Sequence, residues 1–155
     1  MIRKAAQSDI NDIMSLLVQV DMVHHKGRPD LFKGPATKYT KEELADIIND
    51  ESNPVFVFVN DEGNVAGHAF CNIINQPSNH VFTQIKTLYI DDICVDENSR
   101  GRHIGKALYD YVIGFAKEIG CYNVTLNVWE CNQSAKRFYE KMGMSVQKTG
   151  MEIIL

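Results

Sequence analysis

The order of hydrophobic patterns in this sequence predicts a mixed α/β fold with a largely antiparallel first half. Two apolar runs, 55–59 and 65–74, flank the turn sequence at 60–63, which is the pattern of a β-hairpin. The second half alternates a strand pattern, a Gly-containing loop, a helix, a strand and a helix, as expected for a sheet with parallel neighbours. At 155 residues the chain is long enough to bury a core, and we expect a single domain over residues 1–155.

The first part of the chain predicts a short strand and two helices. Residues 2–5 form the strand, and Ser8 is expected to cap a helix over roughly residues 9–24. Apolar residues recur at helical spacing in that helix and should face the core: Ile10, Ile13, Leu16, Leu17 and Val20. After a loop rich in Gly and Pro, the sequence 40–43 (Thr-Lys-Glu-Glu) is a capping box that opens a helix ending near Asn49.

The rest of the chain predicts a long strand over 82–95, a helix ended by Gly120, a strand over 122–128, a helix over 134–142 and a final strand region over 146–155. The helix before Gly120 is expected to bury one apolar stripe: Ile104, Leu108, Tyr111, Val112, Phe115 and Ile119.

Composition narrows the class of protein. A net charge of −4 argues against a general nucleic-acid binder, and no apolar run approaches the length of a membrane span. The N-terminus lacks the apolar region of a signal peptide, and the four scattered cysteines suggest reduced thiols, so we expect a cytoplasmic protein. Histidines and cysteines show no metal-ligand spacing, so no metal is expected.

The most informative stretch is 93–108, which joins an apolar strand end, a polar Gly-containing turn and an amphipathic helix. Free N–H groups at the helix N-terminus, with Arg100, Arg102 and Lys106 nearby, favour a phosphate or pyrophosphate group. A strand–turn–helix that binds nothing is the alternative. A Walker P-loop fits poorly, because Gly101 and Gly105 are separated by three residues instead of four and Ala107 replaces the Ser/Thr.

A second motif follows the next strand and is complete: Asn132, Ala135, Phe138, Tyr139, Gly143 and Met144 in the pattern Asn-x-x-Ala-x-x-Phe-Tyr-x-x-x-Gly-Met. With the turn at Arg100 and Gly105, it resembles the GNAT superfamily of acyl-CoA N-acyltransferases over about residues 88–144. His103 replaces the middle Gly of the family's first motif. We expect His103 to be tolerated in a helical backbone that needs no positive φ.

The resemblance implies a GNAT-type single domain: a mixed, mostly antiparallel central sheet with splayed parallel strands and helices on both faces. It implies acetyl-CoA as co-substrate, with no metal, and direct acetyl transfer to a primary amine of a small molecule or peptide. The pantetheine arm would bond the backbone of one splayed strand and the pyrophosphate would meet the turn. The implied cofactor-binding residues are Ile93, Cys94, Val95, Arg100, Gly101, Arg102, His103, Ile104, Gly105, Lys106, Asn132 and Ala135.

The resemblance also suggests catalytic residues. Tyr139 matches the family tyrosine that protonates the leaving thiolate, with a packing role as the alternative. Asp91 is the first candidate for the general base and matches an acid of the polyamine-acetylating branch; Asp92 is the second, with Glu130 or water as further options. Adjacent strand residues alternate in direction, so Asp91 and Asp92 are expected on opposite faces, Asp91 with Tyr89, Ile93 and Val95.

The acceptor site is expected near the end of the first helix and its loop, at His24, Arg28 and Phe32. A merely solvated loop is the alternative, and Trp129 either lines the pocket or packs. Two other functions stay open: a non-catalytic acyl-CoA-binding sensor on the same fold and, more distantly, a nucleotide-dependent phosphotransferase. No nucleic-acid or membrane partner is expected, and a homodimer is left open.

Overall fold

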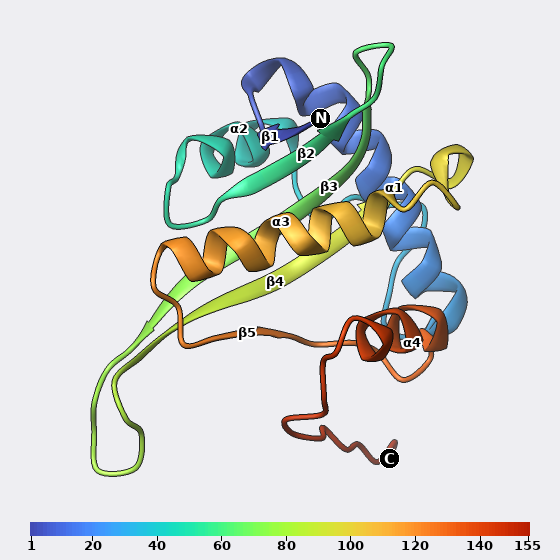
Figure 1. Cartoon of the computed structure of the whole chain (residues 1–155). Coiled ribbons are helices and arrows are strands. Elements are labelled where there is room, and N and C mark those ends of the chain that lie inside the picture. Colours follow the sequence, from blue (N-terminus) through green and yellow to red (C-terminus); the bar gives the residue numbers. More distant parts are fainter.

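A five-stranded sheet forms the centre of the molecule (Figure 1). The computed structural model describes all residues from 1 to 155. The strands lie side by side in sequence order: β1 (Ile2–Lys4), β2 (Val55–Val59), β3 (Val65–Gln76), β4 (Ile85–Val95) and β5 (Asn123–Leu126). Neighbours from β1 to β4 are antiparallel and β4 pairs with β5 in parallel, so the predicted mixed, mostly antiparallel sheet is confirmed.

Helices cover both faces of the sheet (Figure 1). The elements are α1 (Ile10–Gly27), α2 (Lys41–Asn49), α3 (Ile104–Glu118) and α4 (Gln133–Lys141), with 3₁₀ turns η1 (Gln7–Asp9) and η2 (Glu97–Ser99). One buried cluster joins α1 and α2 to the sheet, and the other joins α3, with contacts from α4, to the opposite face. We call these the α1 face and the α3 face. None of the helices combines the length and the apolar character needed to cross a bilayer.

The core stripe of α3 follows helical spacing, with one correction. Ile104, Leu108 and Val112 are almost completely buried, as predicted. Tyr111 is 39% exposed, so its assignment to the core was wrong, and Tyr109 is buried instead. Tyr111 lies at the edge of the stripe, where its ring packs edge-on against Phe56 at 5.1 Å between centroids.

Local hydrogen bonds explain where the first two helices begin. The capping box at α2 is confirmed: Glu43 N donates to Thr40 Oγ1 at 3.1 Å and Thr40 N donates to Glu43 Oε2 at 2.8 Å. Ser8 is not the cap of α1, because it lies inside η1. Ala6 N instead donates to Asp9 Oδ2, and the hydrogen bond from Arg3 holds the pKa of Asp9 below its usual value.

The predicted final strand at 146–155 is absent, because this segment has no neighbouring strand within the chain. Several of its apolar side chains are exposed, among them Val146 at 70% and Ile153 at 84%.

The turn before α3 differs from expectation at His103. Its φ is +59°, in the left-handed region, and not the ordinary helical backbone that we expected. Gly101 also has a positive φ, of 80°. The chain reverses sharply between η2 and α3, and the residue before the helix must adopt a conformation that glycine adopts freely. His103 therefore carries backbone strain, about 1–2 kcal/mol for a residue with a Cβ.

Glycine at position 103 should relieve this strain, whereas alanine should not. We expect the free energy of unfolding of His103→Gly to exceed that of His103→Ala by about 1 kcal/mol, measured by urea denaturation. Asp110, inside α3, provides the control, since there the alanine variant should be the more stable of the two by about 1 kcal/mol. If the glycine variant were the more stable at both positions, or the alanine variant at both, the backbone strain at His103 would be contradicted.

Candidate functional site

The strands β4 and β5 part after Ile90. Their parallel pairing runs from Thr87 with Asn123 to Ile90 with Leu126 and then stops, whereas β4 continues to Val95. Over 91–95, β4 pairs with β3 alone, so its backbone groups on the β5 side have no strand partner. An extended ligand could pair with this free edge as an added strand would.

The turn after β4 leaves backbone donors free at the start of α3. The first backbone hydrogen bond there is donated by Ala107 to the carbonyl of His103, and no side chain caps the helix. The N–H groups of Ile104, Gly105 and Lys106 therefore have no acceptor within the helix. These donors and the positive end of the helix dipole form an anion-binding arrangement at the end of the open β4 edge.

The start of α4 packs beside this turn. A Cβ placed on Gly105 would lie 3.6 Å from both the Phe138 ring and a Val95 methyl group, so the three elements meet closely at this point. Asn132 Oδ1 accepts a hydrogen bond from Ala135 N at 3.2 Å. Asn132 is thus the N-cap of α4.

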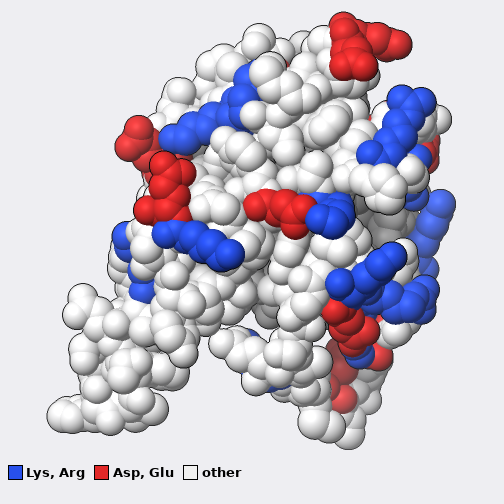
Figure 2. All heavy atoms as spheres, in the orientation of Figure 1, with Lys and Arg blue, Asp and Glu red and all other residues white.

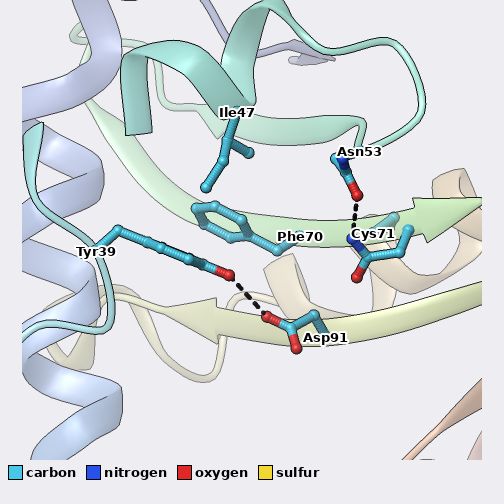
Figure 3. A pocket seen from close by; sticks show the side chains of 7 residues that line it. Tyr39, Ile47, Asn53, Phe70, Cys71 and Asp91 are labelled. Atoms are coloured by element: carbon cyan, nitrogen blue, oxygen red, sulfur yellow. Dashed lines mark hydrogen bonds between the residues drawn. The ribbon is translucent and has the colours of Figure 1, made fainter. Parts of the chain in front are cut away.

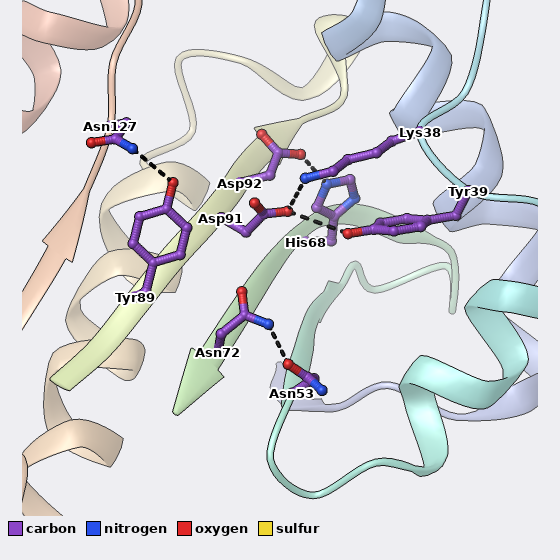
Figure 4. A network of polar contacts seen from close by, with 9 residues as sticks. All are labelled: Lys38, Tyr39, Asn53, His68, Asn72, Tyr89, Asp91, Asp92 and Asn127. Carbon is purple, nitrogen blue, oxygen red and sulfur yellow. Dashed lines mark hydrogen bonds and ion pairs between the residues drawn. The ribbon is translucent and has the colours of Figure 1, made fainter. Parts of the chain in front are cut away.

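A β-bulge brings the two aspartates to the same face. Phe70 pairs with Asp92 and Cys71 pairs with Ile90, so Asp91 is an extra residue without a partner on β3. The expectation of opposite faces was wrong, because the bulge interrupts the alternation of side chains along the strand. Both carboxylates lie on the α1 face (Figure 4), whereas Ile93 and Val95 pack on the α3 face.

Asp91 forms an ion pair with a residue of the α1–α2 loop. Lys38 Nζ lies 2.6 Å from Asp91 Oδ2 and 5.5 Å from the centre of the Tyr39 ring (Figure 4). Burial lowers the pKa of Lys38, but the hydrogen bond and charge of Asp91 outweigh burial and leave that pKa raised. Lys38 is therefore a bound cation in front of Asp91, held partly by the aromatic ring.

Asp91 also lines a small cavity on this face, of about 170 Å³ (Figure 3). The Tyr39 and Phe70 rings stack at 5.8 Å, and the Tyr39 hydroxyl donates to Asp91 at 3.5 Å. The lining residues are Tyr39, Ile47, Asn53, Phe70, Cys71, Asn72 and Asp91. Aromatic rings beside one carboxylate suit a small cationic group.

Asp92 is held by a buried histidine that the sequence did not reveal. His68 on β3 is completely buried, and its Nε2 lies 2.7 Å from Asp92 Oδ2. Its Nδ1 has no hydrogen-bond partner, and its ring packs edge-on against Phe70 at 4.9 Å. A lone histidine within the apolar run at 65–71 was the available signal, and strand pairing is needed to see that it meets Asp92.

Tyr139 lies among aromatic rings that pack against the α3 face. Its ring centre is 5.1 Å from that of Phe138 and 6.4 Å from that of Tyr109. Burial, and then the negative charge of Asp92, raises the pKa of Tyr139. The phenol therefore keeps its proton at neutral pH, although the raised pKa also makes it a weaker acid than an exposed tyrosine.

The residues predicted for acceptor binding form a separate group. The rings of His24 and Phe32 lie 5.0 Å apart, and Phe32 packs edge-on against Trp129 at 5.2 Å. Arg28 forms ion pairs with Asp30 and Glu152. None of these residues lines the cavity at Asp91, so their role in acceptor binding stays a prediction. No group of three or more His, Cys, Asp or Glu side chains gathers as a metal site would require.

Comparison with known proteins places this geometry in a family. The model of the Acetyltransferase (GNAT) family matches residues 21–144. Glucosamine 6-phosphate N-acetyltransferase of Arabidopsis thaliana is 40% identical over 60 residues, 39% of this chain and 38% of that enzyme, so the match spans less than half of the plant protein. Glucosamine 6-phosphate N-acetyltransferase 1 of Dictyostelium discoideum is 25% identical over 121 residues, 76% of this chain and 75% of that protein.

Solved structures agree over the full length. A mutant protein of Bacillus halodurans has a TM-score of 0.96 and 31% identity, covering 100% of this chain and 99% of that one. The Arabidopsis glucosamine-6-phosphate N-acetyltransferase structure has a TM-score of 0.72 and 25% identity, covering 99% and 97%. The splayed strands, the turn before α3 and the family match together show that this chain belongs to the GNAT family of acetyltransferases.

Proposed function

We propose that this chain is an N-acetyltransferase that moves the acetyl group of acetyl-CoA directly to the primary amine of a small molecule or peptide. One observation carries the proposal: the free edge of β4 runs from the open N–H groups of α3 to the bulge where Asp91 faces a cavity. The anion site at one end of this path suits the pyrophosphate of CoA. The carboxylate at the other end suits an amine that must lose a proton before it attacks the thioester.

The proposed cofactor site follows that path. The pyrophosphate meets the turn from Arg100 to Lys106, and the pantetheine arm pairs with the backbone of Ile93, Cys94 and Val95. Asn132 and Ala135 border the arm at the start of α4. The β4 edge beyond Ile90 supports this placement, since no strand of the chain occupies it.

In the proposed reaction the acceptor amine approaches Asp91 from the α1 face, and Tyr139 acts from the α3 face. The acceptor ammonium replaces Lys38 at Asp91, which takes a proton directly or through water. The free amine attacks the thioester carbonyl, the C–N bond forms, and the C–S bond breaks. Tyr139 donates its proton to the leaving thiolate from the side of α4. The nitrogen loses its second proton through water, which restores the Tyr139 phenol, and Asp91 releases its proton to solvent. The products are an acetamide, free CoA and one proton.

Direct transfer is favoured over an acetyl-enzyme intermediate. Burial, then the charge of Asp91, raises the pKa of the Cys71 thiol, which packs in the core of the α3 face behind the cavity, to about 12. That thiol stays protonated and is a poor nucleophile at neutral pH.

The relatives suggest which amine to try first. The Arabidopsis and Dictyostelium proteins are named for glucosamine 6-phosphate, so amino sugar phosphates belong in an acceptor panel with polyamines and peptide amines. Free thiol is measured with acetyl-CoA and each amine. The sensor alternative is favoured by one observation, the Lys38 ion pair that occupies Asp91, and it predicts CoA binding without turnover on any amine.

The proposal extends to the whole chain and its setting. We propose one acetyltransferase domain over residues 1–155 that acts in the cytoplasm, with monomer and homodimer both left open. The scattered cysteine positions support a reducing compartment.

CoA binding should depend on the space beside Gly105. A single Cβ fits there, so Gly105→Ala should keep its affinity, whereas Gly105→Ile would overpack Phe138 and Val95. Overpacking costs about 1–3 kcal/mol, which corresponds to about a 5- to 150-fold loss of CoA affinity if it displaces the turn. Calorimetry with EDTA present measures this loss, and Gly114→Ile, at an open position of the same helix, is the control. Equal loss in both isoleucine variants would argue against a phosphate site at the turn.

Removing the carboxylate of Asp91 should impair transfer while keeping the cofactor bound. We expect Asp91→Asn to lower kcat/KM by about 10²–10⁴-fold, with a smaller loss at high pH where more amine is already deprotonated. Asp92→Asn should lose less, because His68 already holds that carboxylate. Lys38→Met removes the competing cation but leaves the base, so it should lower KM for the amine. Wild-type turnover by Asp91→Asn at pH 7 would exclude Asp91 as the base.

The Tyr139 hydroxyl should matter for turnover and not for folding. Tyr139→Phe keeps the ring packing, and we expect kcat and kcat/KM to fall together by roughly 10- to 1,000-fold with stability little changed. Because the pKa of Tyr139 is raised above its usual 10.0, its ionisation should cause no loss of activity below pH 10. The neighbouring Tyr109→Phe is the matched control. An acyl donor with a more acidic thiol should restore much of the rate of Tyr139→Phe. If it does not, Tyr139 has a packing role and is not the general acid.

A further inference from the structure

Lys38 and Lys106 are alike in exposure and differ in the carboxylate that each one meets. The side chain of Lys38 is 55% exposed and that of Lys106 is 54% exposed, and each forms an ion pair. Asp110, the partner of Lys106, is itself 54% exposed on the surface of α3. Asp91, the partner of Lys38, is only 19% exposed and lines the cavity beside the free edge of β4. Lys38 is thus the lysine whose amine lies against the proposed general base.

The loop that carries Lys38 is held on both sides of that residue. Ala36 N donates to Asp21 Oδ2 on α1 at 2.9 Å, and the ring of Tyr39 stacks on that of Phe70 at 5.8 Å. The Lys38 side chain reaches from this loop toward the carboxylate, alongside Tyr39 (Figure 4). An amine held by its own chain has a much higher effective concentration than a free amine in solution.

The proposed cofactor arm ends where this amine lies. The free edge of β4 starts at the turn before α3 and ends at the bulge, because pairing with β5 resumes at Ile90. The acetyl end of an arm laid along this edge therefore reaches Asp91, the residue that Lys38 contacts at 2.6 Å. No external acceptor is needed to bring an amine to this point.

We propose that Lys38 is itself an acetyl acceptor, so that this chain acetylates its own Lys38 from acetyl-CoA when no other amine occupies the cavity. The inference rests on the proposed function, because it uses the same thioester site and the same base. It adds a modification site and a self-directed activity to that function.

The step follows the proposed chemistry with a different acceptor. Asp91 takes one proton from the Lys38 ammonium, and the free amine attacks the thioester carbonyl. The C–N bond forms, the C–S bond breaks, and Tyr139 protonates the leaving thiolate. The nitrogen loses its second proton through water, which restores the phenol, and Asp91 releases its proton to solvent. The products are Nε-acetyl-lysine, free CoA and one proton.

Acetylation of Lys38 would release Asp91. An acetamide carries no charge and cannot form the ion pair, so the carboxylate becomes free for the ammonium of an external amine. The modified chain should therefore resemble Lys38→Met, with a KM for the amine lower by about two- to five-fold, as the loss of one partly exposed ion pair allows. A chain treated with acetyl-CoA and then desalted tests this, and an unchanged KM would contradict the release of Asp91.

Spontaneous acetylation of surface lysines is the background for the experiment. Figure 2 shows Lys and Arg side chains that project from one face of the molecule into solvent. Lys33 and Lys41 are exposed, lie close to Lys38 in sequence and take part in none of the ion pairs. Burial lowers the pKa of Lys38, but Asp91 outweighs burial and leaves that pKa raised, so uncatalysed acetylation should favour Lys33 and Lys41.

Peptide mass spectrometry of the full chain, incubated with acetyl-CoA and no amine, tests the proposal. We expect Lys38 to be acetylated about 10²–10⁴-fold faster than Lys33 and Lys41. In Asp91→Asn the rate at Lys38 should fall to that of these two lysines, although the substitution frees the Lys38 amine. Acetylation of Lys38 no faster than that of Lys33 and Lys41 in the wild type, or an unchanged rate in Asp91→Asn, would overturn the proposal.

A mixture of two variants tests whether the transfer stays within one chain. One variant carries Asp91→Asn and keeps Lys38, and the other carries Lys38→Arg and keeps Asp91. We expect Lys38 in the mixture to be acetylated no faster than in Asp91→Asn alone. Faster acetylation would show transfer between chains and contradict the intramolecular step.

The amine panel, run in parallel, separates this inference from the proposed function. An amine that is acetylated should slow the modification of Lys38, because both compete for Asp91. Turnover on an added amine while Lys38 stays unmodified, with or without that amine, would overturn self-acetylation and leave the proposed function intact. Absence of both reactions would overturn both claims. Acetylated Lys38 without turnover on any amine would support the inference and count against an external acceptor.

Discussion

The free edge of β4 beyond Ile90 is the feature on which the rest of the site depends. Pairing with β5 stops at Leu126, and the bulge at Asp91 changes the direction of the side chains at the same point. Backbone donors and acceptors that a strand would otherwise use are left for a ligand. The helix that follows β4 starts with three unpaired N–H groups, so one continuous strand–turn–helix unit supplies both the arm site and the anion site.

The two carboxylates at the bulge are each paired with a side chain from another element. Asp91 is held by Lys38 from the α1–α2 loop, and Asp92 is held by buried His68 from β3. The two carboxylates are therefore not equivalent. Asp91 faces a cavity and the Lys38 ammonium, which an acceptor amine would replace in the proposed reaction. Asp92 is held by His68, and its negative charge contributes to the raised pKa of Tyr139. In the proposed reaction, base and acid act from opposite faces of the sheet on a thioester held between them.

Much of this fold follows from local patterns in the sequence. The capping box at Thr40, the turn ending at Gly63 and the buried positions Ile104, Leu108 and Val112 have local causes, and each was predicted correctly. The motif residues also indicated the turn before α3. Tyr111 failed because helical spacing alone does not fix the edge of a buried stripe.

The remaining differences depend on contacts between distant segments. The bulge at Asp91 is a matter of register with β3, which no periodicity within β4 reveals. The Lys38 and His68 contacts each join residues more than 20 positions apart. The segment at 146–155 has the pattern of a strand, but a strand forms only where a partner edge exists.

Hydrogen exchange of backbone amides, measured with and without CoA, probes the free edge of β4 and the start of α3 at individual residues. We expect CoA to slow exchange at the β5-facing amides of 91–95 and at Ile104, Gly105 and Lys106, because these groups would then donate to the cofactor. Slowed exchange elsewhere, with these amides unchanged in saturating CoA, would contradict the claim that the free edge of β4 and the start of α3 form the cofactor site.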